Sequence, residues 1–330
     1  MTARIILDAM GSDTHPAPEV EAAIEAARLF GDEIILAGDE ARLKPLLKGA
    51  AGVRIVHAPD VFEMTDKISP GALRKVQSSM GVAVDLLKAG EADAFVTAGN
   101  TGGAMAISLA RLGRMRGVKR PALSALFPVK GGHCVVADVG ANTECRPEYL
   151  VQFARMGAVY AQLALGKSNP RVGLLANGEE EMKGNDLVKE THPLLKASGL
   201  NFIGNVEGKE LFGGQADVVV TDGFTGNILL KSSEAVAKLL IDTLRAELMG
   251  SLRTKLGALL ARPAFNALRK LLDPAEIGAV PLLGLDGLVF VGHGRSDARA
   301  LVSAIHTARV AVEANLMDSL RRAMGTETSD

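Results

Sequence analysis

The chain has 330 residues, of which 48% are hydrophobic and 23% charged, with a formal net charge of −1. This length suits two domains, or one large α/β domain with additions, and the apolar content excludes a disordered chain. The balanced charge argues against a general nucleic-acid-binding protein, which needs a concentrated basic surface. The two cysteines, Cys134 and Cys145, are too few for a disulfide scaffold and fit a reducing compartment.

The start of the chain, MTARIILDAMGSD, lacks the charged region, apolar core and cleavage site of a signal peptide. No uninterrupted apolar run reaches the ~20 residues that a membrane-spanning helix requires. We therefore expect a soluble cytoplasmic protein.

Strands and helices are predicted to alternate along the first two thirds of the chain. Short apolar or β-branched runs predict strands at residues 4–7, 33–37, 53–57, 94–97, 123–127, 134–137, 171–175, 201–203 and 217–221. Helical spacing of Ala, Leu, Glu and Lys predicts helices such as 19–30, 79–88 and 148–165. A further strand at 287–291 and a closing helix at 296–315 follow. This alternation is typical of a largely parallel, doubly wound α/β sheet covered by helices on both faces, here as a single domain spanning residues 1–330.

The segment from about residue 244 to 280 departs from this alternation, because it is Leu-rich and helical throughout. Between Ser251 and Leu272 it carries five basic residues and no acidic one, namely Arg253, Lys255, Arg262, Arg269 and Lys270. Pro263 fits the first turn of a second helix better than the middle of one long helix. We therefore predict a basic helical hairpin, residues 245–280, inserted into the α/β domain.

Small and polar residues follow five of the predicted strands. The loops read DAMGSD (8–13), AGNTGG (98–103), DVGANT (138–143), ANGE (176–179) and DGFTGNI (222–228). Ligands of doubly wound sheets bind beyond the carboxyl ends of the strands, where helix N-termini offer backbone N–H groups to anions. Turns need glycine but not the repeated Asn, Asp and Thr. We therefore predict a polar oxyanion site formed jointly by these loops.

The anion-binding residues expected from these loops fall into two main sets. The first is Gly99, Asn100, Thr101, Gly102 and Gly103 at a helix start, and the second lies at Gly223 and Gly226. Neither set forms a phosphate-binding GxxxxGK[ST] loop, and the dinucleotide fingerprint GxGxxG is missing as well. An ATP-dependent kinase and a conventional NAD-binding mode are both disfavoured.

In this order, these loops resemble the bacterial phosphate acyltransferases of phospholipid synthesis. The matching segments are LDAMGSD (7–13), TAGNTGGAM (97–105), DVGANTECRPEYLVQFA (138–154), GLLANGEEEMKGND (173–186), NFIGNVEGKEL (201–211), VVTDGFTGNILLK (219–231) and GHGRSDARA (292–300). They span almost the whole chain, with Ser12 standing where the family pattern has a glycine. The resemblance implies a fold like those of phosphotransacetylases and isopropylmalate dehydrogenases.

The resemblance further implies transfer of a long-chain acyl group from acyl-[acyl-carrier protein] to inorganic phosphate. The phosphate would attack the thioester directly, without an acyl-enzyme, and no metal or organic cofactor is implied. It also implies a cytoplasmic homodimer that associates peripherally with the inner membrane and passes acyl phosphate to a membrane glycerol-3-phosphate acyltransferase. The rival functions are transfer of the acyl group from acyl-CoA to phosphate, as in phosphotransacetylases, a dehydrogenase of the isopropylmalate type and a non-enzymatic metabolite-binding regulator.

Such a reaction needs a phosphate cradle, oxyanion donors and a proton or positive field for the departing thiolate. Lys183 is the expected charge partner of phosphate, unless it is an ordinary solvated lysine at a helix start. His293, between two glycines, could protonate the thiolate or bind phosphate, or simply bond backbone in a tight loop. Asn227 and Asp222 flank a glycine turn as catalytic candidates, the alternative being turn and N-cap roles.

The remaining candidates for phosphate or substrate binding are polar residues of the same loops, Asn142, Thr143, Asn177, Asn185 and Lys231. Cys134 and Cys145 have no histidine at an obvious partner position, so each is interpreted as a small core residue and not an acyl carrier. In the basic hairpin, Arg253, Lys255, Arg262 and Lys270 are predicted to contact an anionic membrane or the acidic carrier protein. The alternative is a helix pair that forms a dimer or covers the core.

Overall fold

The computed structural model describes residues 2–66, 77–272 and 274–325. Eleven strands form one sheet in the order β3-β2-β1-β4-β11-β10-β5-β6-β9-β7-β8. The strands are β1 (Arg4–Asp8), β2 (Glu33–Gly38), β3 (Val53–His57), β4 (Ala94–Thr97), β5 (Ala122–Val129), β6 (Gly132–Ala137), β7 (Val172–Leu175), β8 (Phe202–Val206), β9 (Val218–Val220), β10 (Ala279–Leu283) and β11 (Val289–Gly292). All the predicted strands are present.

The sheet consists of two parallel wings joined by an antiparallel centre. Strands β3, β2, β1, β4 and β11 run parallel to one another, and so do β6, β9, β7 and β8. Between the wings, β10 pairs antiparallel with both β11 and β5, and β5 pairs antiparallel with β6. The prediction of a largely parallel α/β sheet is therefore confirmed, while the antiparallel centre was not predicted.

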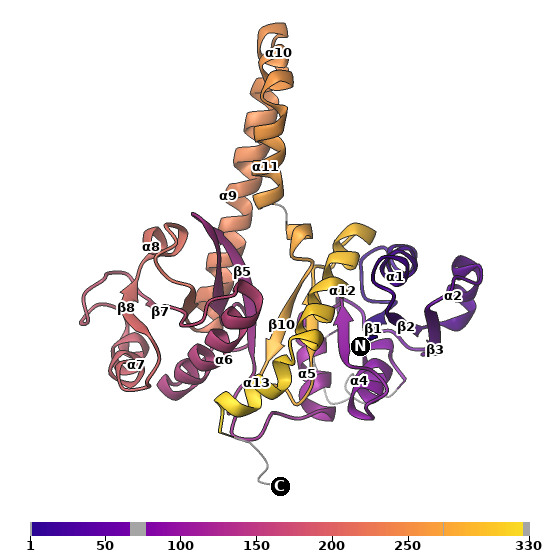
Figure 1. Ribbon diagram of the computed structural model, residues 1–330, viewed down its shortest axis with the longest axis horizontal. Helices are drawn as coiled ribbons and strands as arrows, with labels where there is room; N and C mark the ends of the chain where they lie inside the picture. The colour runs from indigo at the N-terminus through magenta and orange to yellow at the C-terminus, as the bar shows by residue number, and fades with distance from the viewer. Residues whose placement is uncertain (1, 67–76, 273, 326–330) are drawn as a thin grey trace.

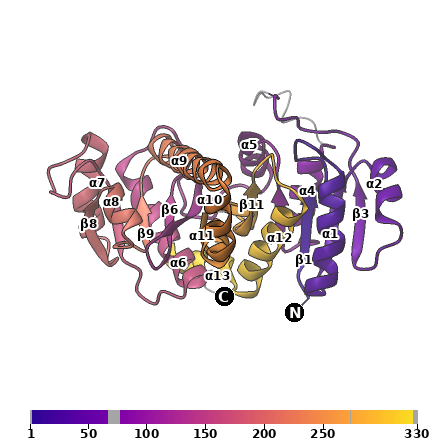
Figure 2. The same ribbon diagram turned by 90° about the horizontal axis from the view of Figure 1, so that it is seen from above.

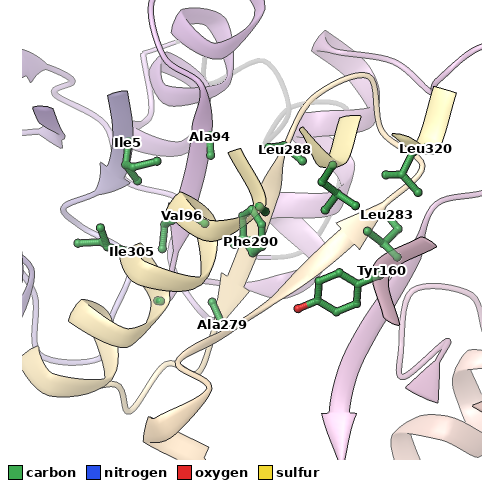
Figure 3. Packing of buried hydrophobic residues seen from close by; sticks show 14 of the residues in the cluster. Ile5, Ala94, Val96, Tyr160, Ala279, Leu283, Leu288, Phe290, Ile305 and Leu320 are labelled. Carbon is green, nitrogen blue, oxygen red and sulfur yellow. The ribbon is translucent and has the colours of Figure 1, made fainter. Parts of the chain in front are cut away.

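Helices cover both faces of the sheet (Figure 2). One face packs against α1 (Ala17–Phe30), α2 (Glu40–Leu47), α6 (Pro147–Leu165), α7 (Asp186–Lys196), α12 (Ala298–Glu313) and α13 (Leu316–Ala323). In Figure 3, Phe290 of β11 and Val96 of β4 lie in this core beside Ile305 of α12. The other face packs against α4 (Ser79–Lys88), α5 (Thr101–Arg111), α8 (Gly208–Phe212) and the start of α9 (Gly223–Met249).

A helical hairpin projects from this body (Figure 1). One arm is the distal part of the 27-residue helix α9, and the other is formed by α10 (Leu252–Leu260) and α11 (Arg262–Leu272). Pro263 lies in the first turn of α11, as predicted. The helical segment thus begins at Gly223 and ends at Leu272, instead of spanning 245–280, because α9 continues directly from a strand-end loop and residues 279–283 pair as β10.

The hairpin exposes large apolar side chains, among them Leu252 at 85% and Leu260 at 77%. Arg253, Lys255 and Arg262 are exposed on the same arm, whereas the side chain of Lys270 lies outside the described residues. Within the described part of the chain, no helix is both long enough and apolar enough to cross a bilayer.

Candidate functional site

The first loop cluster lies at the N-terminus of α5. Asp8, at the end of β1, is buried, and one carboxylate oxygen accepts a hydrogen bond of 2.7 Å from the hydroxyl of Thr97. The Thr97 hydroxyl oxygen in turn accepts the N–H of Gly99 at 2.9 Å. Burial raises the pKa of Asp8. These bonds fix the loop that leads from β4 into α5.

The first turn of α5 offers unpaired backbone donors. Asn100 is the N-cap: its side-chain oxygen accepts the N–H of Gly103 at 2.9 Å, and its carbonyl accepts the N–H of Ala104. The N–H groups of Thr101 and Gly102 have no hydrogen-bond partner among the described residues. Two free N–H groups at the positive end of a helix form a binding site for an anion.

Glycine at two positions of this cluster is dictated by close packing. A Cβ on Gly99 would lie 2.3 Å from the terminal methyl of Met80, and one on Gly103 would lie 2.4 Å from the ring of Phe62. The backbone of the loop therefore approaches its neighbours more closely than any side chain allows.

His293 belongs to the loop after β11, next to the same cluster. This loop is tied to the loop after β1, because the N–H of Asp13 donates to the carbonyl of Gly294 at 2.8 Å. The His293 ring is exposed, and its Nδ1 accepts the N–H of Arg295 at 3.3 Å. Nδ1 thus has the backbone-bonding role that was the alternative for this histidine. Nε2 has no hydrogen-bond partner among the described residues.

The second loop cluster is organised by Asp138, which directly follows β6 and is fully buried. One carboxylate oxygen accepts the N–H groups of Leu123, Gly140 and Ala141 at 3.0, 3.1 and 3.0 Å. The other oxygen accepts the backbone N–H of Asn142 at 2.7 Å and its side-chain N–H at 2.8 Å. Burial nevertheless raises the pKa of Asp138. The backbone donors of this loop point inward and are already used.

The first turn of α9 is held against this loop. The N–H of Gly223 donates to the carbonyl of Asn142 at 2.7 Å, and the N-cap Asp222 accepts the N–H of Thr225 at 2.9 Å. A Cβ on Gly226 would lie 1.9 Å from the carbonyl oxygen of Asp138. Asp222 therefore has the capping role that was its alternative, and one further N–H in this turn, that of Phe224, has no partner among the described residues.

Asn227 lies beside the second cluster with its amide group turned toward Gly140, where an added Cβ would be 3.7 Å from its Nδ2. In contrast, the side-chain N–H groups of Asn142 donate to Pro121 at 2.7 Å and to Asp138, so this residue is engaged within the protein. Thr143 and Lys231 are exposed. Of the polar candidates around α9, Asn227 is half-buried, and its side chain has no hydrogen-bond partner among the described residues.

Lys183, Asn177 and Asn185 lie on the segment between β7 and α7, toward the β8 edge of the sheet. The side chain of Lys183 is exposed and lies against Gly178, and its N–H donates to Glu180 at 2.9 Å. Asn185 is the N-cap of α7, accepting the N–H of Val188 at 3.0 Å. Because β7 pairs in parallel with β9, this segment begins beside the loop that leads from β9 into α9, in the same wing as the second cluster.

Helix α5 and the start of α9 pack on the same face of the sheet. The two wings run in opposite directions, so the two clusters, each at the carboxyl ends of its strands, lie at opposite edges of the sheet. The loops predicted to form one joint site thus form two separate groups, one in each wing, and the joint site stays a prediction. Sequence reasoning missed Asp8, Thr97 and Asp138, which organise these groups. The signal was present, because each is a polar residue at the end of an otherwise apolar strand run.

The cysteines do not have the properties of acyl carriers. Cys134 is buried and Cys145 is half-buried. Burial raises the pKa of each thiol to about 12. The reactive form of cysteine is the thiolate, which is then scarce at neutral pH. In the described part of the chain, no three His, Cys, Asp or Glu side chains gather as a metal site would require.

Comparison with known structures supports the fold. A phosphotransacetylase from Streptococcus pyogenes superimposes with a TM-score of 0.60 at 17% identity, covering 95% of this chain and 94% of that one. The phosphotransacetylase EutD from Staphylococcus aureus gives 0.58 at 15% identity over 95% and 94%. A putative 4-hydroxythreonine-4-phosphate dehydrogenase from Salmonella typhimurium gives 0.56 at 14% identity over 94% and 99%. These similarities show a shared architecture and confirm the expected fold type.

Sequence relatives are closer. Residues 3–319 match the family described as fatty acid synthesis protein. Phosphate acyltransferases from Syntrophotalea carbinolica and Myxococcus xanthus are 47% and 46% identical, covering 100% and 98% of this chain and 97% and 94% of theirs. One from Thermus thermophilus is 48% identical over 97% of this chain and 98% of its own. The chain is thus an acyltransferase and belongs to the phosphate acyltransferase family.

Proposed function

We propose that this protein transfers a long-chain acyl group from acyl-[acyl-carrier protein] to inorganic phosphate and thereby supplies acyl phosphate for phospholipid synthesis. The observation that carries the proposal is the first turn of α5, where the N–H groups of Thr101 and Gly102 are free and the loop before them is fixed by Asp8 and Thr97. This turn suits a small anion. The polar groups around Asn227, in the first turn of α9, suit the thioester carbonyl.

In this reaction, a phosphate oxygen attacks the thioester carbon, a C–O bond forms, and the C–S bond breaks to release the pantetheine thiolate. Phosphate is already an anionic nucleophile, so no Ser-His-Asp triad is needed. The amide of Asn227 would stabilise the developing oxyanion, and Nε2 of His293 would bind phosphate or give a proton to the thiolate. Lys183, on the segment after β7, would neutralise the charge of phosphate.

The decisive experiment incubates the purified protein with palmitoyl-[acyl-carrier protein] and phosphate and follows free carrier thiol, with palmitoyl-CoA in parallel. We expect thiol release that requires phosphate and favours the carrier-protein substrate. Release from CoA alone would support the phosphotransacetylase-type reaction instead, and release from neither would overturn the proposal. Comparison of His293→Ala with Lys183→Ala then ranks the two candidates.

We further propose that the hairpin serves peripheral association with the inner membrane, where a glycerol-3-phosphate acyltransferase would take up the acyl phosphate. Its support is the combination of exposed leucines on α10 with Arg253, Lys255 and Arg262. Replacement of these three and Lys270 by Glu should weaken co-sedimentation with anionic vesicles without unfolding the protein. Unchanged recovery at low and high salt would contradict the membrane role. The alternative role of the exposed leucines is to form the interface of the proposed homodimer, and light scattering of the protein would measure its oligomeric state.

A further inference from the structure

The segment that joins α5 to β5 is an exposed basic surface. Residues 111–121 read RLGRMRGVKRP, without an acidic residue. The side chains of Arg114, Arg116, Lys119 and Arg120 are exposed, and we call these four residues the basic loop. Among the described residues, none of these four side chains forms an ion pair with a carboxylate, and the Arg114 guanidinium donates to the carbonyl of Lys119. In residues 144–155, which lead into and form part of α6, the two acidic residues Glu144 and Glu148 are balanced in number by the two basic residues Arg146 and Arg155.

The backbone of the basic loop is rigidly held. Met115 and Val118 are buried at 1% and 5% exposure and anchor it to the core. The N–H of Met115 donates to Gly284 at 3.0 Å. The side chain of Gln152 on α6 accepts the N–H of Lys119 at 2.8 Å and donates to the carbonyl of Gly117 at 2.9 Å. The cations are therefore held on a fixed frame, and a partner that meets them orders little additional backbone.

The basic loop adjoins both an apolar hollow and the second loop cluster. A cavity of about 380 Å³ beside Gly117 is lined by the apolar side chains of Val151, Leu194 and Met324 and, among others, by the charged residues Glu148 and Arg155. At the C-terminal end of the basic loop, the carbonyl of Pro121 accepts the side-chain N–H of Asn142, a residue of the second loop cluster, at 2.7 Å. An apolar centre with a charged rim is the usual construction of a protein-binding surface.

From this arrangement we infer that the basic loop docks an acidic protein, the carrier that delivers the acyl thioester; this inference rests on the proposed function. The surface lies near α6 and α13, at the end of the molecule opposite the α10 tip (Figure 1). If the tip meets a membrane, the basic loop faces away from it. A soluble acidic partner therefore fits this surface better than an anionic lipid bilayer. The hairpin would then bind the membrane, and the basic loop would bind the carrier protein.

The test reverses two charges whose side chains make no ordered contact, in Arg116→Glu/Lys119→Glu. The matched control, Lys130→Glu/Lys189→Glu, changes the net charge equally at the exposed β5–β6 turn and on α7. At low salt we expect the KM for palmitoyl-[acyl-carrier protein] to rise about tenfold in the first variant and not in the control. The KM for palmitoyl-pantetheine, which has no acidic protein, should stay unchanged. The difference should shrink as salt is added.

Binding of fluorescently labelled carrier protein is measured alongside by anisotropy, so that docking is tested even if no thiol is released. The inference is overturned if the Kd and KM for the carrier are unchanged in Arg116→Glu/Lys119→Glu. It is equally overturned if the KM for palmitoyl-pantetheine rises as much, since the loop would then act on the site itself. Loss of binding to phosphatidylglycerol vesicles with carrier binding intact would assign the surface to lipid instead. Failure of thiol release with carrier binding weakened as expected would affect only the proposed reaction.

Discussion

The two loop clusters are each organised by a buried aspartate, but the two aspartates accept different numbers of backbone hydrogen bonds. In each, a buried aspartate at the end of a strand holds the loop that leads into a helix. Asp8 accepts one backbone N–H, that of Met10, and leaves two free N–H groups on α5. Asp138 accepts four backbone N–H groups and turns the donors of its own loop inward. Similar glycine-rich sequences therefore leave unpaired helix-start donors in one wing and form a tightly hydrogen-bonded loop in the other.

The largest expected effect is on stability, from removal of the Asp138 carboxylate. Asp138→Ala would leave buried N–H groups without partners, each costing about 1–3 kcal/mol. We expect a loss of about 3 kcal/mol or more in the free energy of unfolding, measured by urea denaturation. Asp8→Ala is the matched comparison and should cost clearly less, because it frees one backbone N–H. An equal or reversed order would show that the two carboxylates are not used differently.

The second prediction removes one free donor from α5. Thr101→Pro deletes the N–H at the first helical position, where proline is tolerated, and Asn100 already has the extended ψ of 112° that a following proline favours. A lost hydrogen bond to a charged group is worth about 1.5–3 kcal/mol, so the KM for phosphate should rise about tenfold or more. The control Thr101→Ala keeps the N–H and should retain the wild-type KM. If both variants behave alike, the free N–H does not bind phosphate.

The third prediction concerns pH. Burial raises the pKa of Asp8 above its ordinary value of 3.8, so the folded protein binds this proton more tightly than the unfolded chain does. The resulting stabilisation is complete below pH ~4 and is lost as the pH rises through the raised pKa. Asp8→Asn should therefore lose less stability than wild type between pH 4 and 8 in urea titrations. If the free energy of unfolding of Asp8→Asn falls with pH as steeply as that of wild type, the pH dependence does not come from Asp8.

The smallest effect is expected at Cys145. Its thiol, with a pKa raised by burial to about 12, is not a nucleophile at neutral pH. Cys145→Ser should keep kcat within about twofold of the wild-type value, and mass spectrometry of the protein quenched during turnover should show no acyl-enzyme. An acyl group on Cys145 would require a covalent mechanism.

The sequence by itself determined the local elements and the identity of the loops. Strands such as β3 and β4 and the helix α4 coincide with their predicted ranges, because apolar periodicity and capping are properties of neighbouring residues. The loop motifs that identify the family are equally local. The free N–H groups of α5 follow from the AGNTGG loop, which the sequence indicated as an anion site.

Only the tertiary structure decided the direction of the strands and the separation of the loops. Strand β10 was missed because Ala279–Leu283 follows a Leu-rich helical stretch, and its identity as a strand comes from pairing with residues far away in the chain. That antiparallel pairing separates the two wings and places Lys183 in the wing of the second cluster. The role of Asp138 was hidden for the same reason. A carboxylate is recognised as a structural centre only when distant backbone donors, such as the N–H of Leu123, converge on it.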